Sequence, residues 1–227
     1  ITSAKKTFLA GGDLSAILAV EPGDFAASYE RTQHTKSLLR RLELLGRPVA
    51  AAINGTALGG GMELCLACHA RFCVDAKGVK LGLPETNLGL IPAAGGIVRL
   101  VRIIGLEAAV PLIVDGKSIS PAQAQELGLL NEVLPDVDAA MKAARDWIAS
   151  EPDVTKPWDR KGYTLPGSNA AYMADPTYLR TAPILLIKRS KGRYPAQEAA
   201  MRAAFEGASV DFDAASRIES RHFAGIA

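Results

Sequence analysis

Residues 49–74 read VAAAINGTALGGGMELCLACHARFCV and combine short apolar runs with a turn of three glycines. Residues 49–53 are apolar throughout and are followed by Asn-Gly, which predicts a short strand buried on both faces. The glycines at 59–61 lead into an apolar run over 62–68 that predicts a helix, and residues 71–74 predict a second strand. The order of strand, glycine turn, helix and strand indicates an α/β fold.

The chain on either side of this unit is mainly helical in pattern. Apolar residues recur at helical spacing, with Gly or Pro as stop signals. Residues 1–10 read as the end of a strand that runs into a loop. Residues 151–183 carry Pro, Gly, Ser and Asp without a sustained period, which predicts an irregular surface connection. The predicted helices cover residues 25–45, 94–104 (with Gly105 as the stop), 121–127, 137–149, 195–206 and 211–224.

Composition excludes several classes of protein. The chain has 227 residues, of which 48% are hydrophobic and 22% charged, so it can bury a large core without disulfides or structural metals. Its net charge is +2 and it has no long basic run, so we expect no nucleic-acid partner. No segment approaches the roughly 20 apolar residues of a membrane span. Three cysteines within nine positions do not make a disulfide framework, which favours the reducing cytoplasm.

The glycine turns are candidate anion sites. A glycine run before a helix lets the backbone approach a ligand closely, and the first N–H groups of a helix lack intrahelical acceptors. Gly60 occupies such a position, and Gly12 lies in a second glycine turn, Ala10-Gly11-Gly12-Asp13. Two such N–H groups could converge on one oxygen and stabilise an enolate or a tetrahedral oxyanion. The alternative is a tight turn that needs glycine for its conformation alone.

Two glutamates are candidates for acid–base chemistry. Glu63 lies in the first turn of the predicted helix, and Glu85 follows Pro84 in a loop with apolar neighbours. Desolvation raises the pKa of a carboxyl group, whereas the positive end of a helix dipole lowers it, so the two environments suit different roles. The alternatives are a charge that stabilises the helix start for Glu63 and a solvated loop position for Glu85.

The string Cys65-Leu66-Ala67-Cys68-His69 matches the attachment pattern of c-type haem, and Cys73 adds a third thiol. Haem or metal binding at Cys65, Cys68 and His69 is therefore an alternative function, of a different class from acid–base catalysis at the glutamates. Both cysteines lie in an apolar helical run, where free cysteine behaves as a small buried hydrophobe, and we favour that interpretation. His34 and His222 lie in amphipathic helices and are expected at the surface or its boundary.

Five motifs occur in a fixed order: FLAGGD (8–13), AAING (51–55), LGGGMEL (58–64), LGLPE (81–85) and GLIPAAGG (89–96). Together they strongly resemble the enoyl-CoA hydratase/isomerase (crotonase) family over roughly residues 1–135. The chain most closely resembles the hydratase domain of multifunctional fatty-acid oxidation α-subunits. That likeness extends to ACH (67–69), YPA (194–196), VDFD (210–213) and RIESR (217–221).

The resemblance implies a crotonase-like ββα spiral with C-terminal helices and hydration of trans-2-enoyl-CoA to 3-hydroxyacyl-CoA in β-oxidation. Backbone N–H groups of Gly12 and Gly60 would form the oxyanion hole, and Glu63 and Glu85 would be catalytic. The resemblance implies no metal or redox cofactor. Coenzyme A would enter the site as part of the substrate. The nearer alternative is isomerisation of enoyl-CoA or another acyl-CoA reaction of the family, such as hydrolysis or dehalogenation. The implied substrate-binding residues are Ala10, Leu14, Ile17, Pro92 and Ala93, of which Ala93 replaces a glycine common in the family.

The resemblance also implies a domain organisation. Residues 1–193 would form the hydratase core, which is expected to lack the first strands of the family. Residues 194–227 would be C-terminal helices that resemble the connection into a dehydrogenase domain. The expected partners are the acyl-CoA thioester, that dehydrogenase domain in a longer chain, and a thiolase subunit.

Overall fold

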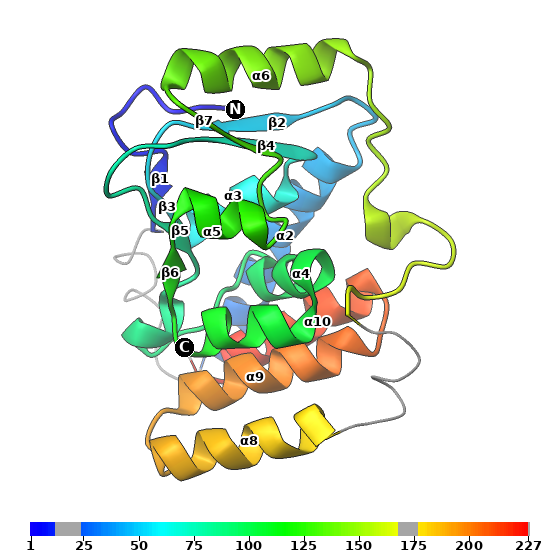
Figure 1. Cartoon of the computed structure of the whole chain (residues 1–227). Coiled ribbons are helices and arrows are strands. Elements are labelled where there is room, and N and C mark those ends of the chain that lie inside the picture. The colour runs from blue at the N-terminus through cyan, green and yellow to red at the C-terminus, as the bar shows by residue number, and fades with distance from the viewer. Residues whose placement is uncertain (12–23, 168–176, 227) are drawn as a thin grey trace.

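The computed structural model describes residues 1–11, 24–167 and 177–226, which form a mixed α/β structure (Figure 1). Its strands are β1 (Leu9–Ala10), β2 (Ala50–Ile53), β3 (Ala57–Leu58), β4 (Ala70–Val74), β5 (Leu81–Gly82), β6 (Ser118–Ile119) and β7 (Glu132–Leu134). Its α-helices are α2 (Phe25–Glu43), α3 (Gly60–Ala67), α4 (Gly96–Val114), α5 (Pro121–Glu126), α6 (Val137–Ala149), α8 (Thr177–Ser190), α9 (Pro195–Ala208) and α10 (Phe212–Ala224). Two 3₁₀ turns are η1 (Glu85–Leu88) and η2 (Pro157–Asp159).

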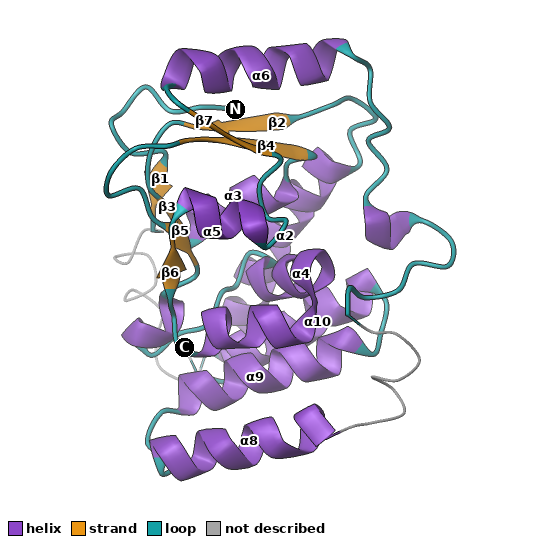
Figure 2. Ribbon diagram, viewed as in Figure 1, coloured by secondary structure: helices purple, strands orange, loops and turns teal. Residues whose placement is uncertain are grey.

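One parallel sheet has the strand order β2-β4-β7. Helix α6 covers one face of this sheet, and α2 and α3 lie on the other side (Figure 2). Every residue of β2 and β4 is buried, because helices exclude water from both faces. The predicted strands at 49–53 and 71–74 are therefore confirmed.

The second sheet has the order β1-β3-β5-β6, with β6 antiparallel to the other strands. Leu58 of β3 pairs with Ala10 of β1 on one side and with Gly82 of β5 on the other. Because β1, β3 and β5 are parallel and in register, the chain leaves all three strands at the same edge. Ligand sites in parallel sheets form at such carboxyl ends.

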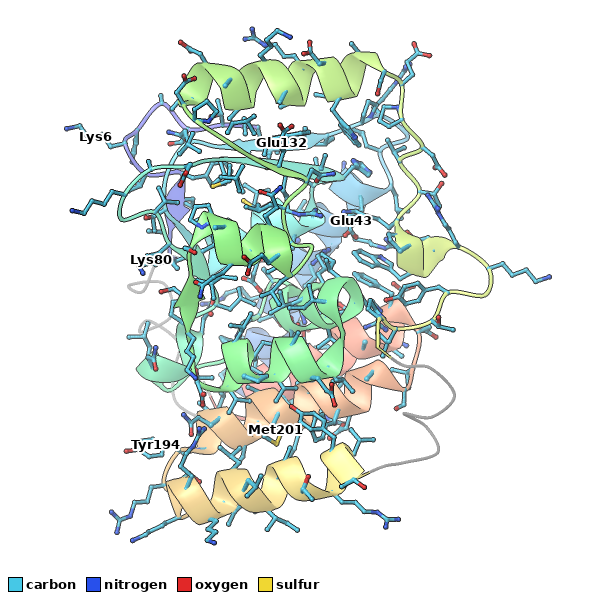
Figure 3. All side chains as sticks on the ribbon, viewed as in Figure 1. Lys6, Glu43, Lys80, Glu132, Tyr194 and Met201 are labelled. Carbon is cyan, nitrogen blue, oxygen red and sulfur yellow. The ribbon has the colours of Figure 1, made fainter. Side chains whose placement is uncertain are left out.

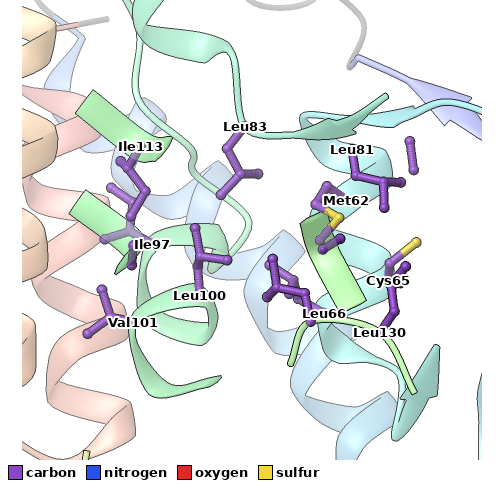
Figure 4. Close-up of a cluster of buried hydrophobic side chains, with 14 of the residues drawn as sticks. Met62, Cys65, Leu66, Leu81, Leu83, Ile97, Leu100, Val101, Ile113 and Leu130 are labelled. Carbon is purple, nitrogen blue, oxygen red and sulfur yellow. The ribbon is translucent and has the colours of Figure 1, made fainter. Parts of the chain in front are cut away.

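The core joins the layers through α3 and α4. Met62, Cys65 and Leu66 of α3 face a cluster that includes Ile97 and Leu100 of α4 (Figure 4). All five side chains are at most 3% exposed. Helix α9 packs along α4, and α10 packs against α9 and α2, so the C-terminal helices share this core.

The fold class predicted from the sequence is confirmed, as are the helices over α2, α3, α5, α6, α9 and α10. Aspartates cap α6 and α10, since Asp136 and Asp211 accept hydrogen bonds from the N–H groups of Ala139 and Ala214. No helix in the described part of the chain is both long and apolar enough to cross a membrane.

Two predicted boundaries are wrong. Gly105 has φ 79°, which interrupts the helix as expected, but the chain resumes helical conformation and α4 extends to Val114. Helix α8 occupies 177–190, and its first half, residues 177–183, lies in the region predicted to be irregular. Pro183 lies inside α8 and weakened the sequence signal. Leu186 is nonetheless buried in the shared core, so packing against α9 outweighs the local preference.

Candidate active site

The candidate site lies at the edge where β1, β3 and β5 end. The N–H of Gly11 donates to the carbonyl of Leu58 (2.9 Å), and the N–H of Gly59 donates to the carbonyl of Gly82 (2.9 Å). These bonds continue the strand pairing into the turns that follow. The glycine turn after β3, which opens α3, and the turn after β5, which opens η1, are thereby held side by side.

The turn before α3 requires glycine at position 59. Gly59 has φ 57°, and a Cβ added there would lie 2.9 Å from Oε1 of Glu85. The next residue, Gly60, is the first of α3, and its N–H has no acceptor among the described residues. The turn therefore presents an unpaired backbone donor close to the carboxyl group of Glu85.

Glu63 is held by the backbone at the start of α4. Its Oε1 accepts hydrogen bonds from the N–H groups of Ala94 (2.7 Å) and Gly96 (2.8 Å). A Cβ at Gly96 would lie 2.8 Å from that oxygen, so glycine permits the approach. Burial and the charge of Glu219 raise the pKa of Glu63 to about 7, although the two N–H groups and Lys36 act in the opposite direction.

Glu85 has a different environment. It is the first residue of η1, and its Oε2 is buried without a hydrogen-bond partner in the described structure. Burial raises the pKa of Glu85 to about 8, and the negative charge of Glu63 contributes to the same shift. The backbone N–H of Glu85 itself acts in the opposite direction. The two carboxyl groups are therefore electrostatically coupled neighbours with different hydrogen bonding: among the described residues, two N–H groups bind Oε1 of Glu63 and none binds Oε2 of Glu85.

Of the other predicted site residues, the structure describes three and leaves three undescribed. Pro92 lies beside Glu63, since a Cβ added at Gly96 would lie 2.8 Å from Oε1 of Glu63 and 3.0 Å from the Cβ of Pro92. Ala93, the next residue, packs against the core. Ala10 is exposed at the end of β1. The predictions for Gly12, Leu14 and Ile17 fall outside the described residues.

The Cys-x-x-Cys-His string has structural contacts. Cys65, Cys68 and Cys73 are free thiols and are buried, and burial raises the pKa of each of them. The imidazole of His69 uses both nitrogens: Nδ1 accepts from the N–H of Val49 (3.1 Å), and Nε2 donates to the carbonyl of Glu43 (3.0 Å). His69 thus connects the end of α2 to the strand that follows it. No group of three metal-ligating side chains occurs in residues 1–11, 24–167 and 177–226.

Sequence reasoning missed a buried ion pair beside Glu63. Nζ of Lys36, on α2, lies 3.0 Å from Oε1 of Glu219, on α10, and their side chains are 4% and 0% exposed. Glu219 follows Ala215 and precedes Phe223 at four-residue spacing on the buried face of α10. A charged residue at a position where the helical period predicts an apolar one was the available signal.

A second buried ion pair contacts the turn at residues 94–96, which binds Glu63. Arg99 donates from Nε to Oε1 of Glu43 (2.8 Å) and from Nη1 to the carbonyl of Ala94 (3.0 Å). Glu43 lies inside the molecule, whereas Tyr194 projects from its surface (Figure 3). Arg99 is 1% exposed, so this pair too is removed from water.

The sequence of this chain is similar to those of known proteins. Residues 1–157 match the family model for enoyl-CoA hydratase/isomerase. The fatty acid oxidation complex subunits alpha of Shewanella frigidimarina and Shewanella amazonensis are 32% and 33% identical to the whole chain. The chain spans about a third of the length of these curated relatives (31%).

Solved structures show the same similarity. An enoyl-CoA hydratase from Bacillus anthracis is 30% identical, with a TM-score of 0.58 over 99% of this chain and 70% of that one. An enoyl-CoA hydratase from Thermoplasma volcanium shares the fold at 23% identity, with a TM-score of 0.60 over 98% of this chain and 71% of that one.

Proposed function

This chain belongs to the enoyl-CoA hydratase/isomerase (crotonase) family, and we propose that it hydrates trans-2-enoyl-CoA to 3-hydroxyacyl-CoA. The observation that carries the proposal is the pair of buried carboxyl groups with unlike hydrogen bonding, Glu63 and Glu85, beside the N–H of Gly60, which has no acceptor among the described residues. Hydration of a conjugated thioester needs a base, an acid and an oxyanion donor, and this arrangement provides one candidate for each.

Glu63 is proposed as the base. Two backbone N–H groups stabilise its carboxylate, so it can accept a proton from water as the water oxygen bonds to the β-carbon. The electrons of the carbon–carbon double bond then move toward the thioester, whose oxygen becomes an enolate. The N–H of Gly60, with Gly12 as its proposed second donor, would stabilise that charge as it develops.

Glu85 is proposed as the acid. With its pKa raised to about 8 and no donor to Oε2 in the described part of the chain, Glu85 carries a proton at neutral pH. Transfer of that proton to the α-carbon collapses the enolate and completes the addition of water. Glu63 then holds the proton taken from water and Glu85 is ionised, and transfer of one proton between them restores the starting state. The addition of water is redox-neutral overall, and the two carboxyl groups and the backbone donors supply the base, the acid and the oxyanion stabilisation, so the proposal includes no metal or redox cofactor.

Isomerisation of 3-enoyl-CoA is the second candidate, because the matching family model covers hydratases and isomerases alike. Moving a double bond requires a proton to leave one carbon and return to another, for which a single acid–base group can suffice. The two coupled carboxyl groups therefore favour hydration.

Single substitutions test both reactions. We expect Glu63→Gln and Glu85→Gln each to lower kcat for hydration of a 2-enoyl-CoA by at least about a hundredfold, the usual scale of acid–base catalysis. Turnover is followed by the loss of the conjugated enoyl absorbance, and a parallel assay follows isomerisation of a 3-enoyl-CoA. Near-normal hydration by either folded variant would remove that residue from the mechanism. An active isomerase without hydratase activity would make the second candidate correct.

The relatives suggest a wider context. They are alpha subunits of a fatty acid oxidation complex and are about three times as long as this chain. We therefore propose that the site acts in fatty-acid β-oxidation and that residues 194–227 lead toward a dehydrogenase domain, with a thiolase subunit as partner. Three free buried cysteines support the proposal of a cytoplasmic location.

A further inference from the structure

The first turn of α4 is bound by two buried carboxylates. The N–H groups of Ala94 and Gly96 donate to Oε1 of Glu63. The intervening N–H, that of Gly95, donates to Oε1 of Glu219 (2.8 Å), and the N–H of Val98 donates to Oε2 of the same side chain (3.1 Å). Glu219 therefore fixes the backbone segment from which Glu63 receives its hydrogen bonds.

Lys36 completes this arrangement from α2. Its ammonium group lies 3.0 Å from Oε1 of Glu219 and also donates to Oγ of Ser220 (2.8 Å) and to the carbonyl of Ser216 (2.7 Å). A fully buried carboxylate is costly without a partner, and a close, hydrogen-bonded cation offsets that cost. Lys36 thus holds the Glu219 side chain at the two N–H groups.

We propose that Glu219 and Lys36 are positioning residues for Glu63: Glu219 fixes the turn that holds the Glu63 carboxylate, and Lys36 holds Glu219 in place from α2. The inference rests on the proposed role of Glu63 as the base of enoyl-CoA hydration. It assigns to the C-terminal helix α10 a part in organising a site whose reacting groups lie far earlier in the chain.

Four charged side chains face Glu63 from the elements packed around it. Glu85 on η1, Glu219 on α10 and Lys36 on α2 interact with it electrostatically. The fourth, Arg99 on α4, is paired with Glu43 and donates to the carbonyl of Ala94, next to the N–H that binds Glu63. The charge of Glu219 raises the pKa of Glu63, whereas that of Lys36 lowers it. Removing the charge of Glu219 while keeping its shape should therefore lower the pKa of Glu63.

Two variants separate charge from reach. Glu219→Gln removes the charge at the same side-chain length and leaves one acceptor oxygen for the two N–H groups, whereas Glu219→Asp keeps the charge on a side chain too short to reach both of them. In each variant, ¹³C NMR follows titration of the Glu63 carboxyl carbon, assigned by its loss in Glu63→Gln. We expect the Glu63 midpoint to fall by about one pH unit in Glu219→Gln, because a neighbouring negative charge is lost. In Glu219→Asp it should rise, because a displaced turn weakens the two N–H hydrogen bonds that lower the pKa of Glu63.

Turnover gives the second readout. Glu219→Asp should lower kcat for enoyl-CoA hydration about tenfold with KM unchanged, because a displaced turn shifts the base without altering substrate contacts. The matched control is Thr32→Val, which removes the hydrogen bond from Thr32 to Ser220 (2.7 Å) at the same contact between α2 and α10. It should leave both the Glu63 midpoint and kcat unchanged.

The outcomes are distinguishable. An unchanged Glu63 midpoint in folded Glu219→Gln would overturn the proposal, as would equal effects of Thr32→Val. If Glu219→Gln fails to fold, unchanged kcat and unchanged amide resonances of Gly95 and Val98 in Glu219→Asp would overturn it instead. A wild-type chain that does not hydrate enoyl-CoA would contradict the proposed function, whereas a shifted Glu63 midpoint would still support positioning by Glu219.

Discussion

Glu63 and Glu85 are the same residue type on neighbouring turns, yet their surroundings differ. Two N–H groups stabilise the anion of Glu63, and Oε2 of Glu85 has no hydrogen-bond partner in the described structure. Their pKa values rise to about 7 and about 8 respectively. Neighbouring groups whose pKa values are pushed apart are suited to separate roles as base and acid.

This difference predicts the pH dependence of hydration. The proposed mechanism needs Glu63 ionised and Glu85 protonated, so kcat/KM should rise as pH increases through about 7 and fall as it increases through about 8. The two limbs belong to the coupled pair. Initial rates with a saturated-chain acyl-CoA inhibitor as a binding control would measure the profile. A rate that is constant from pH 6 to 9 would contradict the assignment.

The Gly60 N–H can be tested without changing a reactive side chain. Gly60 is the first residue of α3, where proline is best tolerated, so Gly60→Pro removes the donor with little cost to the helix. Loss of one oxyanion donor should lower kcat about a hundred- to a thousandfold. Gly60→Ala is the control, because it keeps the N–H and, among the described residues, its Cβ would meet only the carbonyl oxygen of Gly11, at 3.9 Å. Equal kcat in the two folded variants would rule out the donor.

At the scale of elements, helix α3 does two things at once. Its first turn carries Gly60 and Glu63, and its later residues Cys65 and Leu66 are buried in the core. The start of α3 therefore cannot shift unless the core also shifts. Helix α8 is less firmly packed than α3. Its residues Ile184 and Leu185 are exposed, and Leu186 is buried.

The cysteines of α3 should matter for packing only. Cys65→Ala with Cys68→Ala leaves two small cavities, and we expect it to lower the free energy of unfolding by about 1–3 kcal/mol. Hydration by the folded variant should equal that of wild type, as should the metal content measured by elemental analysis. Stoichiometric zinc or haem in wild type that disappears in the double variant would establish the alternative interpretation of the string.

At the scale of the whole molecule, distant segments meet around buried charge. Glu63 on α3, Lys36 on α2 and Glu219 on α10 surround the start of α4, although 183 positions separate the last two. Contacts of such sequence separation form only when the chain is nearly folded. The stability of the protein and the geometry of the candidate site therefore depend on the same interactions.

The raised carboxyl pKa values predict how stability depends on pH. Between the ordinary value of 4.5 and about 8, the folded state binds more protons at Glu63 and Glu85 than the unfolded state does. The free energy of unfolding should consequently decrease as pH rises through this range. Urea titrations at several pH values would measure this decrease. Glu85→Gln should make it shallower and should be more stable than wild type above pH 8.

The control is Glu132→Gln on β7, whose exposed carboxylate is solvated in both states. It should reproduce the wild-type decrease. If Glu85→Gln also follows the wild-type curve from pH 4.5 to 8, Glu85 does not hold a raised pKa in the folded protein.

Most of the local structure could be predicted from the sequence, because its signals act over a few residues. The apolar run of β2, the glycines before α3 and the capping aspartate of α6 each specify their own backbone conformation. The ordered motifs also identified Glu63, Glu85 and Gly60 as candidates. Helix α8 could not be predicted, because Pro183 obscures its pattern and burial of Leu186 stabilises it.

Only the tertiary structure decided what surrounds the two carboxyl groups. A pKa depends on burial and on charges within a few ångströms, whichever part of the chain supplies them. The charges at Glu63 come from Lys36 and Glu219, and its two N–H donors come from a turn some thirty residues downstream. Sequence order specified the candidates, and folding determined their hydrogen bonds, their burial and hence their protonation.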